Sequence, residues 1–432
     1  RDKLVTGVQT CALPICFTPT TPLAEGAHQL TATAIDPVGN ESKPSGSFVV
    51  NVDTTPPPTP SAATGYADNV GSVQSPTSTA KITDDTTPAL NIGAVPAGLT
   101  PSLYVDGNKV ASTYDPVAGT LTPNVPLAEG SHQIGYTLTD AAGNESKQAP
   151  ALAVAINTNA PSTPTAATGY ADNVGAIQSP NSSASTTDDT TPGINIGTVP
   201  SGLTPSLYVD GAKIASTYDP ATGTLTPSTA LPEGKHRISY TLTDAAGNES
   251  KQAPALAVIV DKSAPAVPAI GSASDNMGSV QGPLASGGVT DDTTPTLTGS
   301  GATPGDVIKV YDNASPIGST TVQPDGTWSF TPTTPLAEGS HRLTTTAVDP
   351  AGNESPPSGA FTVNVDTTAP AALDASKIQV LDDVGTVQGP IASGAQTDDS
   401  KPEYTGKADP AQVSSINVYD NGKLIGSTAV NA

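Results

Sequence analysis

The sequence predicts an all-β protein, built as a series of β-sandwich domains of about 104 residues each. Two observations predict this fold. The same short motifs return at intervals of 103 to 107 residues, and between them apolar and polar residues alternate along short segments. Alternation with a period of two indicates strands with one buried face, and repetition over about 100 residues marks a whole domain.

Three motifs carry the repetition, and each occurs four times. Thr-Asp-Asp-(Thr/Ser)-x-Pro has its first Asp at Asp84, Asp188, Asp291 and Asp398. Asp-x-x-Gly-Asn-Glu-Ser begins at Asp36, Asp140, Asp244 and Asp349, and Leu-(Ala/Pro)-Glu-Gly-x-His ends at His28, His132, His236 and His341. The unit is therefore a domain rather than the roughly 20–50-residue turn of a solenoid.

Linkers with proline separate the units. They begin at Asp53, Asn157, Asp261 and Asp366, and each reaches a proline within five residues. Proline fixes φ and lacks an N–H, which suits a stiff, extended connector. We expect the tail of one unit at 16–52, whole units at 53–156, 157–260 and 261–365, and a truncated unit at 366–432, so that the sequence is a fragment cut at both ends.

The first fifteen residues carry a different signal. Val5–Ile15 reads VTGVQTCALPI, which resembles the translation of a common sequencing-library adapter, and Arg1-Asp2 fits the segment that precedes it. A genuine, signal-like N-terminus is the alternative, but no basic region followed by an apolar core is present. We expect residues 1–15 to be an artefact. Both cysteines, Cys11 and Cys16, then derive from adapter bases, which leaves no disulfide and no thiolate metal site.

Within a unit, strands are short and separated by turns. Ile134, Tyr136 and Leu138 alternate with small or polar residues, and Leu103–Val105 leads into a turn at Asp106-Gly107, which indicates a hairpin. About seven such strands fit in one unit, the number typical of a sandwich. We expect Trp328, the single tryptophan, to anchor one core, with Leu121 and Leu225 in its place in the two preceding units.

Composition excludes several partners. The formal net charge is -23 and the pI is about 4.2, whereas nucleic acids and anionic membranes need basic patches. No apolar run approaches the roughly 20 residues of a membrane-spanning helix. Large aliphatic residues and Phe make up just under a fifth of the chain, which alone would favour disorder. The alternating pattern and the modest charge density favour folded domains with small cores.

No motif points to an enzyme. The sequence has no nucleophile elbow, zinc-protease, phosphate-loop or dinucleotide motif. A pair of acids for glycoside hydrolysis would lack an insertion to form a cleft and an aromatic platform for the sugar. Each histidine stands alone in its unit, so we expect a hydrogen bond to a loop rather than zinc binding or a catalytic pair.

At this point the residues resemble a known family. The runs Val-Asp-Thr-Thr-Ala-Pro from Val365, Val-Tyr-Asp-Asn from Val310 and Asp-Gly-Thr-Trp-Ser-Phe-Thr-Pro from Asp325, together with the motifs above, are similar to bacterial immunoglobulin-like repeats. Such repeats form the long central region of giant Gram-negative surface adhesins of the biofilm-associated, type I-secreted kind. The resemblance covers residues 16–432. It implies tandem immunoglobulin-like β-sandwiches arranged end to end as a rod.

Sandwich topology predicts where the acidic loops meet. In such a sandwich the loop at Asp140, between the last two strands, lies at the pole beside the incoming linker, whereas Asp84 and Asp85 lie at the opposite pole. Each joint would then gather oxygen ligands from two domains and the linker, which suits calcium. The candidate ligands are Asp53, Asp140, Asn144, Glu145, Asp188, Asp189, Asp261, Asp291, Asp292, Asp349, Asn353, Glu354 and Asp366.

Two considerations limit the calcium hypothesis. Asp and Asn before Gly are ordinary turn residues that hydrogen-bond their own backbone, so any one of these side chains has a structural alternative. Asn157 also stands where the other linkers have Asp, and we expect that joint to bind calcium weakly or not at all. The resemblance to adhesin stalks, by contrast, implies that calcium binds between the domains.

The resulting functional hypothesis is a non-enzymatic stalk of a bacterial cell-surface or secreted adhesin. It would present an adhesive domain that lies outside this sequence, for attachment and biofilm formation, and its partners here would be the neighbouring repeats. Contact with a host surface or matrix polysaccharide would be made by domains outside the sequence. Two alternatives stay open: a glycan-binding module, and the accessory spacer of a secreted polysaccharide-degrading enzyme.

Overall fold

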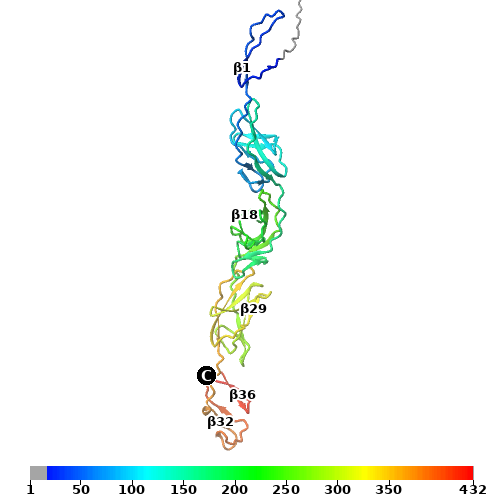
Figure 1. The fold of residues 1–432 in the computed structure, drawn as a ribbon. Coiled ribbons are helices and arrows are strands. Elements are labelled where there is room, and N and C mark those ends of the chain that lie inside the picture. The colour runs from blue at the N-terminus through cyan, green and yellow to red at the C-terminus, as the bar shows by residue number, and fades with distance from the viewer. Residues whose placement is uncertain (1–16, 432) are drawn as a thin grey trace, which may run out of the picture. The chain divides into compact units, whose positions relative to one another are not determined.

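The structure is a computed structural model that describes residues 17–431, and it confirms the all-β prediction (Figure 1). Among those residues the one helical element is a short 3₁₀ turn, η1 (Ala375–Lys377). No described helix has the length and apolar character needed to cross a membrane. The predicted artefact at 1–15 lies outside the described residues. The chain divides into two compact units, 1–262 and 263–432, which are treated separately below.

Repeats 53–156 and 157–260 of the first unit have the same topology. Each contains two five-stranded sheets, ordered β4-β3-β6-β10-β9 with β5-β12-β11-β7-β8, and β14-β13-β16-β20-β19 with β15-β22-β21-β17-β18. The first repeat comprises β3 (Tyr66–Asp68), β4 (Ser75–Ser78), β5 (Ile82–Thr83), β6 (Ala89–Asn91), β7 (Thr100–Val105), β8 (Asn108–Val110), β9 (Ser112–Asp115), β10 (Thr120–Pro123), β11 (Gly130–Thr139) and β12 (Leu152–Ile156). The second comprises β13 (Tyr170–Asp172), β14 (Ser179–Ser182), β15 (Thr186–Thr187), β16 (Gly193–Asn195), β17 (Thr204–Val209), β18 (Ala212–Ile214), β19 (Ser216–Asp219), β20 (Thr224–Pro227), β21 (Gly234–Thr243) and β22 (Leu256–Val260).

The described residues of each of these repeats form ten strands, where the sequence predicted about seven. The difference arises because the chain changes sheets in mid-course. β8 pairs with β7, and after one residue β9 crosses to the other sheet and pairs with β10. β5 likewise leaves the β3–β4 sheet and pairs parallel with β12. Each change of sheet divides one expected strand into two short ones.

The cores are small, as predicted, and built from a few large side chains. Tyr66, Leu90, Leu103 and Leu121 are at most 1% exposed in the first repeat, and equivalent residues fill the second. The outer face of the long strand β11 is also covered, because the side chain of Gln148 lies over Gly135. Residues 134–138, in the second half of this strand, are therefore buried on both faces.

Repeat 261–365, which belongs to the second unit from residue 263 on, differs on one edge. Its sheets are β24-β23-β26-β29 and β25-β31-β30-β27-β28, so one sheet has four strands instead of five. The long β28 pairs with β27 along its whole length, and no part of it pairs with the other sheet. The elements are β23 (Ser272–Asp275), β24 (Gly282–Leu284), β25 (Gly288–Thr290), β26 (Thr296–Ser300), β27 (Val307–Asp312), β28 (Ser315–Thr321), β29 (Thr327–Phe330), β30 (Gly339–Val348) and β31 (Phe361–Val365).

Trp328 is a core residue, as predicted, but its predicted counterparts were wrong. Trp328 is 2% exposed and pairs with Gly299, whereas Phe330 pairs with Leu297 in the way that Leu121 pairs with Leu90. Leu121 therefore corresponds to Phe330. The Gly-Thr-Leu and Gly-Thr-Trp motifs look aligned in the sequence, but the hairpin before β29 places Trp328 two residues earlier in the register.

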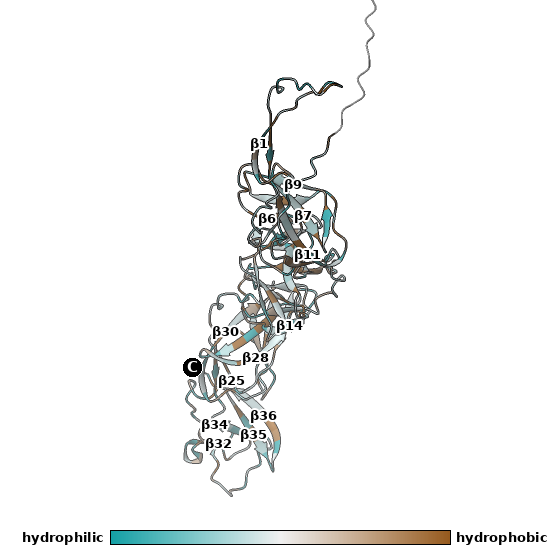
Figure 2. Cartoon of the chain, turned by 45° about the horizontal axis from the view of Figure 1, so that its top comes forward, coloured by the Kyte–Doolittle hydropathy of each residue, from teal (hydrophilic) through white to brown (hydrophobic). Residues whose placement is uncertain are grey.

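The terminal segments contain parts of the same pattern. β1 (Gly26–Leu30) pairs with β2 (Phe48–Val52) in the first unit. In the second unit, β32 (Gln379–Asp382), β33 (Gly389–Pro390) and β34 (Glu403–Thr405) form one sheet, and β35 (Ser415–Asp420) and β36 (Lys423–Ala429) form another. Figure 2 shows β36 as one of the more apolar strands, and its Leu424 and Ile425 are about half exposed.

Candidate functional site

The joint at Asn157 brings together the two loops that sandwich topology predicts. The backbone N–H of Asp84 donates to the carbonyl of Ala246 at 3.1 Å, and that of Ser72 donates to the carbonyl of Gly247 at 3.1 Å. The acidic loop after β5 of one repeat therefore contacts the loop between β21 and β22 of the next. This is the only joint at which all three predicted elements lie in one unit of the described structure.

The acidic loop contributes buried carboxylates. Asp84 is 7% exposed and Asp85 is 1% exposed, and one oxygen of each (Asp84 Oδ1 and Asp85 Oδ2) is buried without a hydrogen-bond partner. Gly71, at φ +68°, makes room for Asp84, because a Cβ there would collide with its carboxylate. Burial raises the pKa of Asp84, and the negative charges of Asp68 and Asp244 raise it further. The joint thus holds more negative charge than its hydrogen bonds neutralise.

The loop after the long strand is a side-chain-capped turn. Asp140 Oδ1 accepts the backbone N–H of Asn144 at 2.9 Å, and its Oδ2 accepts the side-chain amide of Asn144 at 3.0 Å. These bonds, first of all the one from the Asn144 side chain, lower the pKa of Asp140. Asp349 repeats the arrangement with Asn353 in the second unit. The turn alternative thus accounts for the contacts that these two aspartates make.

The glutamate of the same motif bonds mainly within its own domain, although at the joint of Asn157 Glu249 Oε2 also accepts a hydrogen bond from Ser72 Oγ of the preceding repeat at 3.1 Å. Glu145 Oε1 accepts hydrogen bonds from Thr137 Oγ1 at 2.5 Å and Tyr104 Oη at 2.8 Å, with Lys109 Nζ at 3.5 Å. The Thr137 hydroxyl is the main cause of a lowered pKa for Glu145, followed by that of Tyr104. Glu354 is held in the same way by Thr346, Tyr311 and Lys309. These glutamates join strands of one sheet.

The linker residues divide into two kinds. Asp53 and Asp366 each accept the N–H two residues ahead, from Thr55 at 3.1 Å and Thr368 at 3.1 Å. Asn157 accepts the equivalent bond from Asn159, but its amide nitrogen also donates to Asp244 Oδ2 at 3.0 Å. An amide donor therefore neutralises part of the acidic cluster at this joint, and a carboxylate at this position would lack that donor.

The remaining candidates fit the same scheme. Asp189 and Asp292 are buried like Asp85, and each accepts an N–H from the second residue ahead. Asp188, Asp189 and Asp261 belong to the first unit, whereas Asp291, Asp292, Asp349, Asn353, Glu354 and Asp366 belong to the second. Their predicted assembly therefore stays a prediction. Within the part of the chain that the structure describes, no three His, Cys, Asp or Glu side chains are arranged to hold a metal ion.

Each described whole repeat holds its histidine between two acceptors. His132 Nδ1 lies 2.7 Å from Asp106 Oδ2, and Nε2 lies 2.8 Å from the carbonyl of Ala128. The predicted loop bond is therefore confirmed, but sequence reasoning missed the aspartate, which sits in the hairpin turn 26 residues earlier. Burial alone would lower the pKa of His132, but its bonds to Ala128 and Asp106 outweigh burial and raise it.

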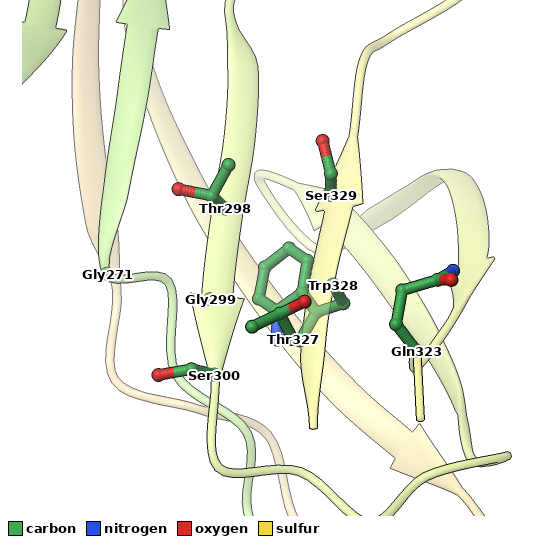
Figure 3. A pocket seen from close by; sticks show the side chains of 8 residues that line it. All are labelled: Gly271, Thr298, Gly299, Ser300, Gln323, Thr327, Trp328 and Ser329. Atoms are coloured by element: carbon green, nitrogen blue, oxygen red, sulfur yellow. The ribbon is translucent and has the colours of Figure 1, made fainter. Parts of the chain in front are cut away.

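A hollow of about 550 Å³ lies beside Trp328 in repeat 261–365 (Figure 3). Hydroxyl and amide side chains surround it, including Thr298, Ser300 and Gln323, and no charged residue lines it. The indole ring lies against Gly299, and its Nε1 is buried without a hydrogen-bond partner. The hollow offers neither an exposed aromatic face for a sugar nor a nucleophile with a base.

Comparison with known proteins identifies the repeats. The family model for the bacterial Ig-like domain matches residues 64–158, 164–262 and 268–367, which together make up more than half of the chain. Each match begins within one predicted repeat, covers the rest of it, and ends two residues into the next linker. No curated protein matches the chain.

Solved structures that match the chain have low identity to it and low TM-scores. The fibronectin(III)-like modules of Clostridium thermocellum CbhA are 12% identical, over 49% of this chain and 92% of theirs, with a TM-score of 0.26. A tetra-tandem repeat in the extending region of a large adhesion protein is 17% identical, over 82% and 97%, with a TM-score of 0.20. The BSP domain of a biofilm-associated protein is 16% identical, over 72% and 67%, with a TM-score of 0.18. Likeness at this level says nothing about function.

Proposed function

Because the chain belongs to the bacterial Ig-like domain family, we propose that it is a stretch of the extracellular stalk of a large bacterial surface adhesin. In this proposal the repeats are spacers. They hold a distal adhesive domain away from the cell for attachment and biofilm formation, and they carry out no chemical reaction. The acidic, cysteine-poor composition suits a soluble, self-repelling surface structure.

The observation that carries the proposal is the joint at Asn157. Two folded repeats are connected by a short linker, and their loops are hydrogen-bonded across it through Ser72, Asp84, Ala246 and Gly247. A string of independent domains needs no such bonds. Direct backbone contact between consecutive repeats limits their relative motion, which is what a spacer requires to keep its reach.

We further propose calcium at the joints whose linker begins with Asp. The buried Asp189 presents an oxygen, Oδ2, without a hydrogen-bond partner, as Asp85 does in the preceding repeat. Unneutralised carboxylate oxygens are the ligands that calcium prefers. Asp189 and Asp261 would contribute on one side of their joint, and Asp349 with Asn353 on the other. The ion would supply positive charge. At the joint of Asn157 the side-chain amide takes over part of this role.

Small-angle X-ray scattering of the full chain, first in chelator and then with added calcium, tests both parts. A stalk predicts an elongated particle whose maximum dimension increases or becomes better defined with calcium. An elongated profile that does not change when calcium is added would contradict the calcium proposal and support the spacer proposal. A profile of freely jointed domains in both conditions would contradict the stalk.

A glycan-binding role is the less favoured alternative. Sugar rings stack on exposed aromatic side chains, whereas the single tryptophan, Trp328, is 2% exposed. The hollow beside it is lined by small hydroxyl residues and contains no charged group. Tyr404 and Tyr419, which are about half exposed and line a second hollow of about 690 Å³ in the truncated repeat, are the described feature that keeps this alternative open.

A further inference from the structure

We infer that the joints contain a metal-free clamp, in which one linker peptide group is held from both sides, by a glutamate of the preceding repeat and an asparagine of the following one. The glutamate belongs to the Leu-(Ala/Pro)-Glu-Gly-x-His motif and the asparagine to the Asp-x-x-Gly-Asn-Glu-Ser motif. Its mechanical consequence rests on the proposed stalk function, but its existence does not.

The joint at Asn157 shows the complete clamp. The backbone N–H of Thr158 donates to Glu129 Oε1 at 2.8 Å, and the Thr158 hydroxyl donates to the same carboxylate oxygen. The side-chain amide of Asn248 donates to the carbonyl oxygen of Asn157 at 2.7 Å. That carbonyl and the N–H of Thr158 belong to one peptide bond. Both polar atoms of one rigid plane are therefore fixed, one by each repeat.

The preceding joint repeats the arrangement with a different linker residue. The N–H of Thr54 donates to Glu25 Oε1 at 2.9 Å, and the amide of Asn144 donates to the carbonyl of Asp53 at 2.9 Å. The clamp uses main-chain atoms, so it forms whether the linker begins with Asp or with Asn. In the second unit the glutamate half recurs, where Glu338 Oε2 accepts the N–H of Thr367 at 3.0 Å.

The clamp extends order beyond the last strand of a repeat. The N–H of Asn157 already donates to the carbonyl of Thr83 at 2.9 Å, so β12 continues its pairing up to the linker. The glutamate then fixes the next peptide group. Hydrogen bonds to an ionised carboxylate are stronger than those between neutral groups, and the bond from the neutral asparagine adds a tie to the next repeat. Neither bond involves a cation.

One joint supplies a natural variant. In the linker that begins at Asp261, Lys262 replaces the threonine, and its N–H lies 3.4 Å from Glu233 Oε1, at the outer limit of a hydrogen bond. Lysine has no hydroxyl to donate at this position. The glutamate half of the clamp is therefore weaker at Lys262 than at Thr158, although both belong to the first unit.

Amide hydrogen exchange on the full chain, in chelator, tests the clamp. Peptides that span 156–160, resolved by mass spectrometry, report the Thr158 amide. We expect it to be protected, and Glu129→Ala to accelerate its exchange about tenfold or more, because a bond to a charged acceptor is lost. Asn248→Ala should increase the relative motion of the two repeats, measured by residual dipolar couplings. Glu129→Gln keeps an acceptor and should restore part of the protection.

Glu233→Ala is the matched control. Exchange at Lys262 should already be faster than at Thr158 and should change less than threefold, whereas Lys262→Thr should slow it. Thermal unfolding of each variant shows whether the domains themselves are intact. A Thr158 amide that exchanges at the same rate in Glu129→Ala and in the parent chain, with the domains folded, would overturn the clamp. The scattering experiment would still test the stalk function, because that test does not depend on the clamp.

Discussion

The joints at Asp53 and Asn157 hold the same peptide group in the same way but differ in one side chain. Asn144 and Asn248 bond equivalent carbonyls, and Glu25 and Glu129 bond equivalent amides. Only Asn157 can then donate to the carboxylate of the following loop, as it does to Asp244. The backbone therefore sets the geometry of a joint, and the linker side chain sets its charge. The two properties can be changed independently.

Replacing Asn157 by Asp should have the largest effect. Asn157→Asp removes the amide donor to Asp244 and adds a carboxylate to a joint that already contains Asp84 and Asp85. In chelator we expect a loss of about 2 kcal/mol in the free energy of unfolding, the usual cost of leaving a partly buried charged group unpaired. Calcium should restore it. Thermal or denaturant unfolding of the full chain, with and without calcium, measures the change.

Asp53→Asn is the reverse exchange and its control. It should weaken any calcium response of the first joint and leave the clamp in place. If Asn157→Asp and the parent chain respond to calcium equally, the linker side chain does not set the affinity of the joint for calcium.

Removing a buried carboxylate should have a smaller effect, of opposite sign. Asp84 has a raised pKa because it is buried and lies near Asp68 and Asp244, so its charged form destabilises the fold. Its contribution to stability is present at low pH and is lost as pH rises through the folded-state pKa. Asp84→Asn should therefore stabilise the chain by about 1 kcal/mol at neutral pH in chelator and flatten this pH dependence.

Denaturant unfolding of this variant between pH 4 and pH 8 gives the comparison. Asp115→Asn, at an exposed turn, serves as the control. A loss of stability at neutral pH in chelator would mean that the ionised Asp84 carboxylate makes a net stabilising interaction in the folded chain, contrary to this prediction.

The smallest effect should come from the histidine contacts. The two ring nitrogens of His132 both face hydrogen-bond acceptors, Asp106 Oδ2 and the carbonyl oxygen of Ala128. Only the protonated ring has two N–H donors, so only that form can donate to both acceptors together. Its folded-state pKa is raised, so its stabilising contribution is complete below the unfolded pKa and is lost as pH rises through the folded one.

Asp106→Asn should lower the pKa of His132 and reduce this dependence, by less than about 1 kcal/mol because Asp106 is half exposed. A titration of the His132 ring protons by NMR reads the pKa directly. Asp210→Asn repeats the test in the next repeat. An unchanged pKa in both variants would show that the carboxylate does not hold the proton.

The sequence predicted the features that depend on repetition and period, and missed those that depend on register and distant pairing. The number of described whole repeats, the all-β class and the meeting of the Asp84 loop with the Asp244 loop follow from motif spacing and sandwich topology. The predicted equivalence of Leu121 and Trp328 was wrong, because a hairpin of different length shifts the strand register without changing the local sequence motif.

The candidate site was predicted in position more than in detail. Glu145 was grouped with the joint because it follows Asn144, but in an extended segment adjacent side chains point to opposite sides. It therefore bonds Thr137 and Tyr104 in its own sheet. Glu129 was not singled out, because its partner, Thr158, lies 29 residues away and carries no charge pattern that sequence reading detects.

Because the clamp side chains bond to main-chain atoms, each repeat carries in its own sequence the side chains that it needs for its two connections. A repeat carries the glutamate for the linker that leaves it and the asparagine for the linker that enters it. Neighbouring copies need no matched pair of side chains to join. Recombination between near-identical copies can therefore lengthen or shorten the array by whole repeats, and every new neighbour finds a compatible connection already made.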